Sequence, residues 1–330
     1  MALPEVYRVV QSFRAALTAR EAAQMALMAR RWAPVRQALE KQIADLAEFL
    51  ADRPYVTQAQ LMRMERYQSL LAQVRIQIRQ YSDWADGRIK DEQRAMGWLG
   101  QKHAGAALDA WQMGARFDTL NPAAVESIVG VTQSGAPVGR LLMEAWPDAV
   151  EGITKALVSG VAMGQNPRKT ARQMAEGLDG ALDRMLRIAR TEQLRAYRAG
   201  TMERFKSSKL IVGYRRLSAK QERTCIACLV DDGKFYELDE EFSDHVNGRC
   251  AAIPVLAGHE DDKVPYQTGQ QWFEKQDDAA QQRIMGKAKW QAWQDGEFKL
   301  DDLVKRTESE TWGPSIGVVS LHDLVSTTEA

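Results

Sequence analysis

The stretch Cys225–Cys250 reads CIACLVDDGKFYELDEEFSDHVNGRC and contains every cysteine of the 330-residue chain. Together with His245, these cysteines follow the pattern C-x2-C-x16-H-x4-C. A tetrahedral zinc ion takes four sulfur or nitrogen donors, and a short C-x2-C turn supplies two of them. The spacing therefore predicts a structural zinc site with the ligands Cys225, Cys228, His245 and Cys250.

The same residues also have a plainer interpretation. Three cysteines can be buried small hydrophobic side chains, and His245 can be a hydrogen-bonded histidine that never meets a metal. A catalytic zinc is disfavoured, because four protein ligands leave no position for water and the chain has no H-E-x-x-H motif. We therefore expect an ion at this position to hold the fold together and not to perform chemistry.

Short strands are expected around the cysteines. Asp232-Gly233 follows the C-x2-C pair and is flanked by the apolar segments Ile226–Val230 and Lys234–Leu238, which predicts a β-hairpin with an Asp-Gly turn. Ala251–Leu256 is a further short apolar run and predicts another strand. The region of the cysteines is thus expected to form a small β-containing domain.

Several segments in this region carry a resemblance to a known family. They are IARTE at 188–192, RTCIAC at 223–228, DGK at 232–234, HVNGRC at 245–250 and IPV at 253–255. In this order they resemble the Mu F-like head-morphogenesis domain of tailed phages. The resemblance implies a structural minor head protein that lies in the capsid interior near the portal. It also implies the portal protein and other head components as partners, with a part in head assembly and in DNA packaging or ejection.

One departure from the family pattern concerns the metal. The family closes its motif with H-P-x-C-R-C, whereas this chain has Val246 in place of the proline and Gly248 in place of the first cysteine. If that cysteine is the family's fourth ligand, Cys250 alone can replace it here.

Composition indicates the class of protein. Lysine plus arginine equals aspartate plus glutamate at 44 each, so the whole chain has no net charge that would attract it to nucleic acid or anionic lipid. No run of about 20 apolar residues exists to span a bilayer, and Met1–Val10 lacks the features of a signal peptide. We therefore expect a protein without membrane contact that is made in a reducing cytoplasm. The resemblance adds the expectation of a non-enzymatic protein that assembles in the host cytoplasm and resides in the virion.

The first two hundred residues show helical periodicity. Apolar residues recur at helical spacing over 6–50, with an expected break or kink at Pro34 and a stop at Pro54. Further helices are predicted from Thr57, over 83–117, over 138–163 and after Asn166-Pro167. With the β-containing region of the cysteines, the expected fold is α+β, with a helical N-terminal region at 1–165 and a helical C-terminal segment at 259–330. The resemblance implies that residues 166–258 form the Mu F-like domain, that the N-terminal region makes the portal or partner contact, and that the C-terminal segment packs on the Mu F-like domain.

Charge is locally segregated. The segment 181–225 holds twelve basic residues against four acidic ones, and its predicted helix has one basic face. That face could bind double-stranded DNA without sequence preference, as in a zinc-stapled DNA-binding protein. Alternatively, the arginines form a solvated face or pair with the acidic residues between 231 and 245. The candidate DNA contacts are Arg184, Arg187, Arg195, Arg198, Arg215 and Arg216.

An enzyme of the ADP-ribosyltransferase type is a third interpretation. Such domains are sometimes joined to Mu F-like domains, and Arg190 and Glu192 could serve one. Residues two apart on a helix point about 160° from each other, so these two side chains do not share a site. We expect a structural role for Glu192 and no catalytic residues in the chain.

Overall fold

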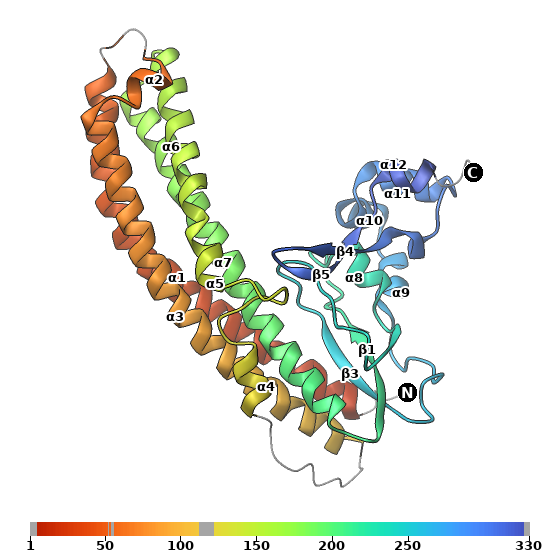
Figure 1. Cartoon of the computed structure of the whole chain (residues 1–330). Helices are drawn as coiled ribbons and strands as arrows, with labels where there is room; N and C mark the ends of the chain where they lie inside the picture. The colour runs from red at the N-terminus through yellow and green to blue at the C-terminus, as the bar shows by residue number, and fades with distance from the viewer. Residues whose placement is uncertain (1–4, 52, 54–55, 112–121, 327–330) are drawn as a thin grey trace. The chain divides into compact units, whose positions relative to one another are not determined.

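The computed structural model describes residues 5–51, 53, 56–111 and 122–326 (Figure 1). The chain divides into two compact units: residues 19–92 and 136–192, called the helical unit, and residues 1–18, 93–135 and 193–330, called the sheet unit. Among the described residues, three long helices contribute to both units: α1 (Glu5–Ala51), α3 (Glu65–Asp109) and α7 (Pro167–Lys206). The α+β class is confirmed, with a mainly helical N-terminal region. The division at residues 165 and 258 stays a prediction.

The helical unit is held by close helix packing. Besides its parts of the long helices it contains α2 (Gln58–Leu61), α5 (Val138–Met143) and α6 (Ala145–Ala162). A Cβ atom placed on Gly152 of α6 would lie 2.9 Å from the Cα of Gly177 on α7, so two glycines allow these helices to touch backbone to backbone. The hydroxyl groups of Tyr67 and Thr154 lie 2.6 Å apart in the buried interior.

Of the break or kink predicted at Pro34, the break is wrong, because α1 is helical on both sides of the proline. Proline costs about 3 kcal/mol inside a helix. Here Trp32 and Leu39 are each 1% exposed, so buried side chains on either side of the proline hold α1 in the helical state. The predicted stop at Pro54 and the end of the predicted helix at 117 lie outside the described residues. Within the described residues, α1 ends at Ala51 and α3 ends at Asp109.

Two predicted helix starts are confirmed. The side chain of Thr57 caps α2 in a full capping box with Gln60, although α2 is only one turn long. The α7 helix begins at Pro167, and the side chain of Asn166 accepts a hydrogen bond from the backbone N–H of Arg168.

The sheet unit contains a three-stranded antiparallel sheet in the order β2-β1-β3. Its strands are β2 (Phe235–Glu237), β1 (Ile211–Leu217) and β3 (Ala251–Leu256). Figure 1 shows β1 and β3 running side by side. In the register of the sheet, Tyr214 of β1 lies opposite Pro254 of β3 and Tyr236 of β2. The predicted strand at Ala251–Leu256 is thus confirmed as β3, all six residues of which are buried.

The predicted hairpin is wrong in one of its arms. Ile226–Val230 forms a short helix, α8, and β2 pairs with β1 instead. All five residues of α8 are buried, and a short apolar run of this kind fits a buried helix as well as a buried strand. The Asp-Gly turn itself is present: Gly233 has φ 87°, and its backbone N–H donates to the carbonyl of Arg216.

The C-terminal segment packs on α8. Its elements are α9 (Gly269–Glu274), α10 (Asp278–Met285), α11 (Lys287–Gln294), the 3-10 helix η1 (Leu300–Leu303), β4 (Val304–Ser309), β5 (Gly313–Val318) and α12 (Leu321–Ser326). Ile226 and Leu229 of α8 share an apolar cluster with Phe273 and Leu303. The β4–β5 hairpin was not predicted. Residues 305–308 of β4 are all exposed, so they lack the apolar alternation that signals a strand.

Candidate metal centre

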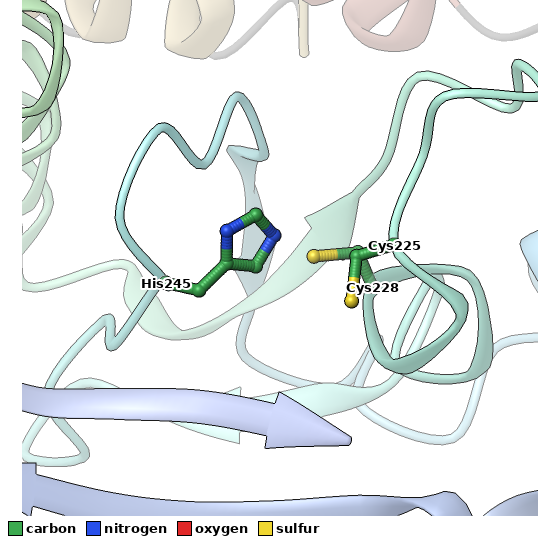
Figure 2. Close-up of side chains that lie close together, drawn as sticks. All are labelled: Cys225, Cys228 and His245. Atoms are coloured by element: carbon green, nitrogen blue, oxygen red, sulfur yellow. The ribbon is translucent and has the colours of Figure 1, made fainter. Parts of the chain in front are cut away.

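Helix α8 positions the C-x2-C pair. Cys225 is the residue before the helix and Cys228 lies in its first turn, and the Cys225 carbonyl accepts the N–H of Leu229. Residues three apart on a helix are neighbours on its surface, so both thiols leave α8 on the same side. Figure 2 shows the two sulfur atoms beside the imidazole of His245.

A tight turn before β3 supplies the other two predicted ligands. The backbone N–H of Gly248 donates to the carbonyl of His245 at 2.8 Å, and Asn247 has φ 65° within that turn. Asparagine tolerates this left-handed conformation better than most residues. Cys250 follows directly and precedes β3, so the sheet fixes its backbone.

The ligand atoms form two overlapping groups. Those of Cys225, Cys228 and His245 all lie within 4.8 Å of one another, and so do those of Cys228, Asp244 and Cys250. Sulfur ligands on one zinc ion lie about 3.8 Å apart, given a zinc–sulfur bond of about 2.3 Å. The five residues therefore could hold a metal, and Cys228 is the residue that both groups share.

The imidazole of His245 is oriented by its neighbour. Its Nδ1 lies 2.8 Å from the carbonyl oxygen of Val246, which can accept the Nδ1 proton and leave Nε2 for a metal. The hydrogen bond to Cys225 raises the pKa of His245 to about 9. The hydrogen bond from the Cys228 thiol lowers the pKa of Cys225 to about 4, while Cys225 and Cys250 raise the pKa of Cys228. Hydrogen bonds thus link His245 to Cys225, Cys225 to Cys228 and Cys228 to Cys250. A cation bound by the thiolates and the imidazole would replace the protons of these hydrogen bonds.

Asp244 was not predicted to belong to the centre. Its side chain is 0% exposed and forms ion pairs with Arg216 at 2.7 Å and Arg198 at 3.3 Å. Burial alone would raise the pKa of this carboxyl group, but Arg216 and Arg198 outweigh burial and hold the pKa below its ordinary value. An anionic carboxylate therefore lies next to the sulfur ligands.

Gly248 leaves no room for a side chain. A Cβ atom at this position would lie 2.1 Å from Cγ of Asp244 and 2.2 Å from its Oδ2. The space that a cysteine at 248 would need is filled by the Asp244 carboxylate. The glycine that stands in place of the family's cysteine at 248 thus leaves room for the carboxylate of Asp244, four positions before it.

A cavity gives access to the centre. It has a volume of about 290 Å³, and Cys225, Cys228, His245 and Cys250 all contribute to its lining, together with Arg14. Cys228 and Cys250 are buried, whereas Cys225 is partly exposed. An ion can therefore enter from the side of Cys225.

Most of the six candidate DNA-binding arginines have protein partners. In the helical unit, Arg184 pairs with Glu144 and Asp148, while Arg187 is exposed. In the sheet unit, Arg195 donates to the backbone carbonyls of Ile128 and Val131.

The other three arginines are buried in the sheet unit. Arg198, Arg215 and Arg216 are 8%, 8% and 3% exposed. Arg215 donates to the carbonyls of Gly233 and Asp262. These three guanidinium groups bind other parts of the protein and are not available to DNA, which argues against one continuous basic face. DNA contact stays an untested alternative.

Arg190 and Glu192 also have internal surroundings. Nε of Arg190 lies 2.5 Å from a carboxylate oxygen of Glu21, and Glu192 is 0% exposed. A carboxylate without exposed surface offers nothing to a substrate. This geometry gives the ADP-ribosyltransferase interpretation no support.

The family comparison addresses the stretch that contains the metal centre. Residues 151–253 match the model of the family described as Phage Mu protein F like protein. This stretch therefore resembles the domain of that family and is called the Mu F-like domain. The Mu F-like domain runs from within α6 to within β3 and so includes Cys225, Cys228, His245 and Cys250.

The resemblance seen in the sequence is confirmed by this match. A Mu F-like domain points to a phage head morphogenesis protein, and it belongs to a structural family of phage proteins. No curated protein and no solved structure matches the chain significantly. Within the described residues, no helix combines the length and the apolar character needed to cross a membrane.

Proposed function

We propose that this chain is a structural minor head protein of a tailed phage that acts in head assembly near the portal. The Mu F-like domain at residues 151–253 is the observation that carries the proposal. Its partners are the portal protein and other head components, and its place is the capsid interior. A role in DNA packaging or ejection follows from that place. We assign the portal or partner contact to the N-terminal helical residues 1–165.

We further propose that the Mu F-like domain is stapled by one zinc ion, with Cys225, Cys228, His245 and Cys250 as ligands. Three thiolates and one imidazole are a donor set that zinc prefers, and four protein ligands make a closed structural site. The proximity of Cys225, Cys228 and His245, the proximity of Cys228 to Cys250, and the cavity that all four line support the assignment. An ion here would connect α8 with the turn before β3. No reaction is assigned to it.

Isolation of assembled heads tests the proposed place of the protein. Heads and empty precursor heads are purified from infected cells, and their proteins are quantified by mass spectrometry. The proposal predicts that this chain is present in both and that chemical cross-linking joins it to the ring-shaped portal protein. Its absence from both particles would refute the proposed function. Cross-links to the outer shell alone would refute the place near the portal.

The DNA-binding alternative is tested on the purified chain. A protein that binds DNA without sequence preference should shift a DNA duplex in a gel at low ionic strength, and its affinity for the duplex should fall steeply as the salt concentration rises. We expect no such shift, because Arg198, Arg215 and Arg216 are buried in the sheet unit. A salt-sensitive shift that disappears in an Arg187→Gln variant would instead support DNA contact at the exposed part of α7.

A further inference from the structure

The carboxylate of Asp244 anchors the loop 243–250, called the metal loop because it carries His245 and Cys250, to the rest of the sheet unit. Its Oδ1 accepts hydrogen bonds from Nη2 of Arg216 at 2.7 Å and from the backbone N–H of His245 at 3.0 Å. Its Oδ2 is 3.3 Å from Nη1 of Arg198 and accepts the backbone N–H of Cys250 at 3.4 Å. Two of these four donors belong to the backbone of predicted metal ligands, so one side chain fixes both.

The two arginines hold the loop from two different elements. Arg216, on β1, also donates to the carbonyl of Ser243 at 2.7 Å, and Arg198, on α7, donates to the carbonyl of Gly248 at 3.1 Å. Both guanidinium groups lie near the ring of Phe242, at 4.8 Å for Arg216 and 5.6 Å for Arg198. Charge-assisted hydrogen bonds in a buried setting are strong and directional. The loop 243–248 is thereby clamped at both ends.

The absence of a side chain at Gly248 is part of the same arrangement. The Asp244 carboxylate fills the space next to the Gly248 backbone so closely that a Cβ atom would overlap with it. A loop with a larger residue at 248 could not seat this carboxylate under the backbone N–H groups of His245 and Cys250. Asp244 and Gly248 therefore form a matched pair.

We propose that Asp244 is a positioning residue for the metal centre, which it preorganises together with Arg198 and Arg216 without ligating the ion. The inference rests on the proposed zinc site. Oδ1 of Asp244 accepts from Arg216, from the His245 N–H and, at 3.9 Å, from the Cys228 thiol, and Oδ2 is engaged by Arg198 and the Cys250 N–H. A carboxylate offers about four acceptor positions, so the charged and backbone donors alone fill them. Ligation would require breaking a buried ion pair, which is strongly unfavourable. Cys250, whose N–H is held by Asp244, is left as the fourth ligand.

The variant Asp244→Asn tests this role. Asparagine keeps the size of the side chain but has a single acceptor oxygen and no charge, so one arginine and one loop N–H lose their partner. Loss of a residue that orients metal ligands lowers metal affinity by about 10- to 100-fold. Zinc affinity is measured on the full chain by competition with a chromogenic chelator. In parallel, the absorption spectrum of the cobalt(II)-loaded protein reports the ligand set.

Asp232→Asn is the matched control. The Asp232 side chain is also 0% exposed, accepts the backbone N–H groups of Ser218 and Gly269, and pairs with Lys220 at 3.0 Å. It lies in the same unit, but these three partners all lie outside the loop 244–250. Asp232→Asn should destabilise the protein while leaving zinc affinity unchanged, which separates a general loss of stability from a specific effect on the centre.

Each outcome decides the proposal. It is supported if Asp244→Asn weakens zinc binding by about 10- to 100-fold and keeps the thiolate-to-cobalt bands of the wild-type protein, while Asp232→Asn leaves zinc affinity unchanged. Changed cobalt bands would mean that Asp244 is itself a ligand, and unchanged zinc affinity would mean that it positions nothing. Either result overturns the proposal. A wild-type chain that binds no zinc would instead overturn the zinc staple on which the inference rests.

A second variant applies if Asp244→Asn does not fold. Arg198→Gln leaves Asp244 and both of its backbone hydrogen bonds in place and removes the guanidinium contacts from α7 to Asp244, Gly248 and the Phe242 ring. Zinc affinity should fall with the cobalt bands preserved. Faster zinc transfer to the chelator in this variant supports the clamp, and transfer at the wild-type rate contradicts it.

Discussion

At the scale of single residues, the contact between Asp244 and Gly248 makes a specific prediction. Gly248→Ala forces a Cβ atom against a buried carboxylate, and overpacking of this kind costs about 1–3 kcal/mol. Combining it with Asp244→Ser, which shortens the opposing side chain, should recover part of that cost. Chemical denaturation of the two single variants and the double variant measures the coupling.

Two residues that contact each other typically couple by about 0.5–3 kcal/mol. Strictly additive effects of Gly248→Ala and Asp244→Ser would show that the two positions do not touch in solution. The glycine in the metal loop would then no longer be explained by the Asp244 carboxylate.

A second residue, His103, should make the stability of the sheet unit depend on pH. Burial lowers the pKa of His103 to about 4, with a smaller contribution from Lys102. Its ring stacks on Phe13 at 3.7 Å, and Nδ1 lies 3.1 Å from the hydroxyl of Tyr197. The folded-state pKa is below the unfolded value of about 6.5, so the neutral ring contributes stability that is fully present above pH 6.5. That contribution is lost as the pH falls from about 6.5 to about 4.

The measurement is thermal unfolding of the wild-type protein and of His103→Gln between pH 7.5 and pH 4. Glutamine cannot take up the proton, so the variant should lose less stability than the wild type over the same interval. Parallel losses in both proteins would show that His103 does not cause the dependence.

The residue scale also shows what sequence reasoning could reach. The spacing of the cysteines and His245 predicted a set of side chains that do lie close together. Asp244 was missed because its partners Arg198 and Arg216 lie 46 and 28 positions before it, and no local pattern announces such contacts. The arginines were interpreted as a DNA-binding face or, alternatively, as a solvated face or as partners of the acidic residues between 231 and 245. Arg198 and Arg216 do pair with Asp244 of that acidic stretch. Helical periodicity could not decide between these alternatives, because it shows which residues share a face but not what packs against that face.

At the scale of elements, the crossing of α3 and α7 in the sheet unit depends on glycine. A Cβ atom on Gly200 of α7 would lie 2.1 Å from the backbone carbonyl oxygen of Gly97 on α3. Neither backbone can give way without moving a helix, so Gly200→Ala should lower the free energy of unfolding by about 1–3 kcal/mol. Urea denaturation followed by circular dichroism checks this.

Gly180 is the control in the same helix. A Cβ atom there meets nothing within 4 Å. Alanine is the better helix former by about 0.8–1.0 kcal/mol, so Gly180→Ala should stabilise the protein slightly. If Gly200→Ala were as harmless as Gly180→Ala, the close crossing of α3 and α7 would be wrong.

Elements were predictable where a local signal defines them. Asn166-Pro167 and the capping box at Thr57 mark helix starts by backbone chemistry that acts within three residues. By contrast, α8 was mistaken for a strand, because its apolar run says only that it is buried. That β2 pairs with β1 and not with Ile226–Val230 is decided by a contact about twenty residues away in sequence. Tertiary context outweighs strand propensity at such a distance.

At the scale of the whole molecule, the two units should respond differently to loss of the metal. All proposed ligands belong to the sheet unit, and the helical unit has its own buried core. Treatment with a zinc chelator should therefore expose residues 211–256 to amide hydrogen exchange while residues 19–92 keep their protection. Exchange measured by mass spectrometry with and without chelator tests this. A uniform increase over both units would contradict a local staple, and so would no change at all.

The central claim is that Cys225, Cys228, His245 and Cys250 close around one zinc ion in the Mu F-like domain. X-ray absorption at the zinc edge of the purified full chain tests it most directly. The account predicts about one zinc per chain, with three sulfur neighbours at about 2.3 Å and one nitrogen at about 2.0 Å. Zinc that is absent, or that is bound by oxygen and nitrogen atoms without three sulfurs, would contradict it.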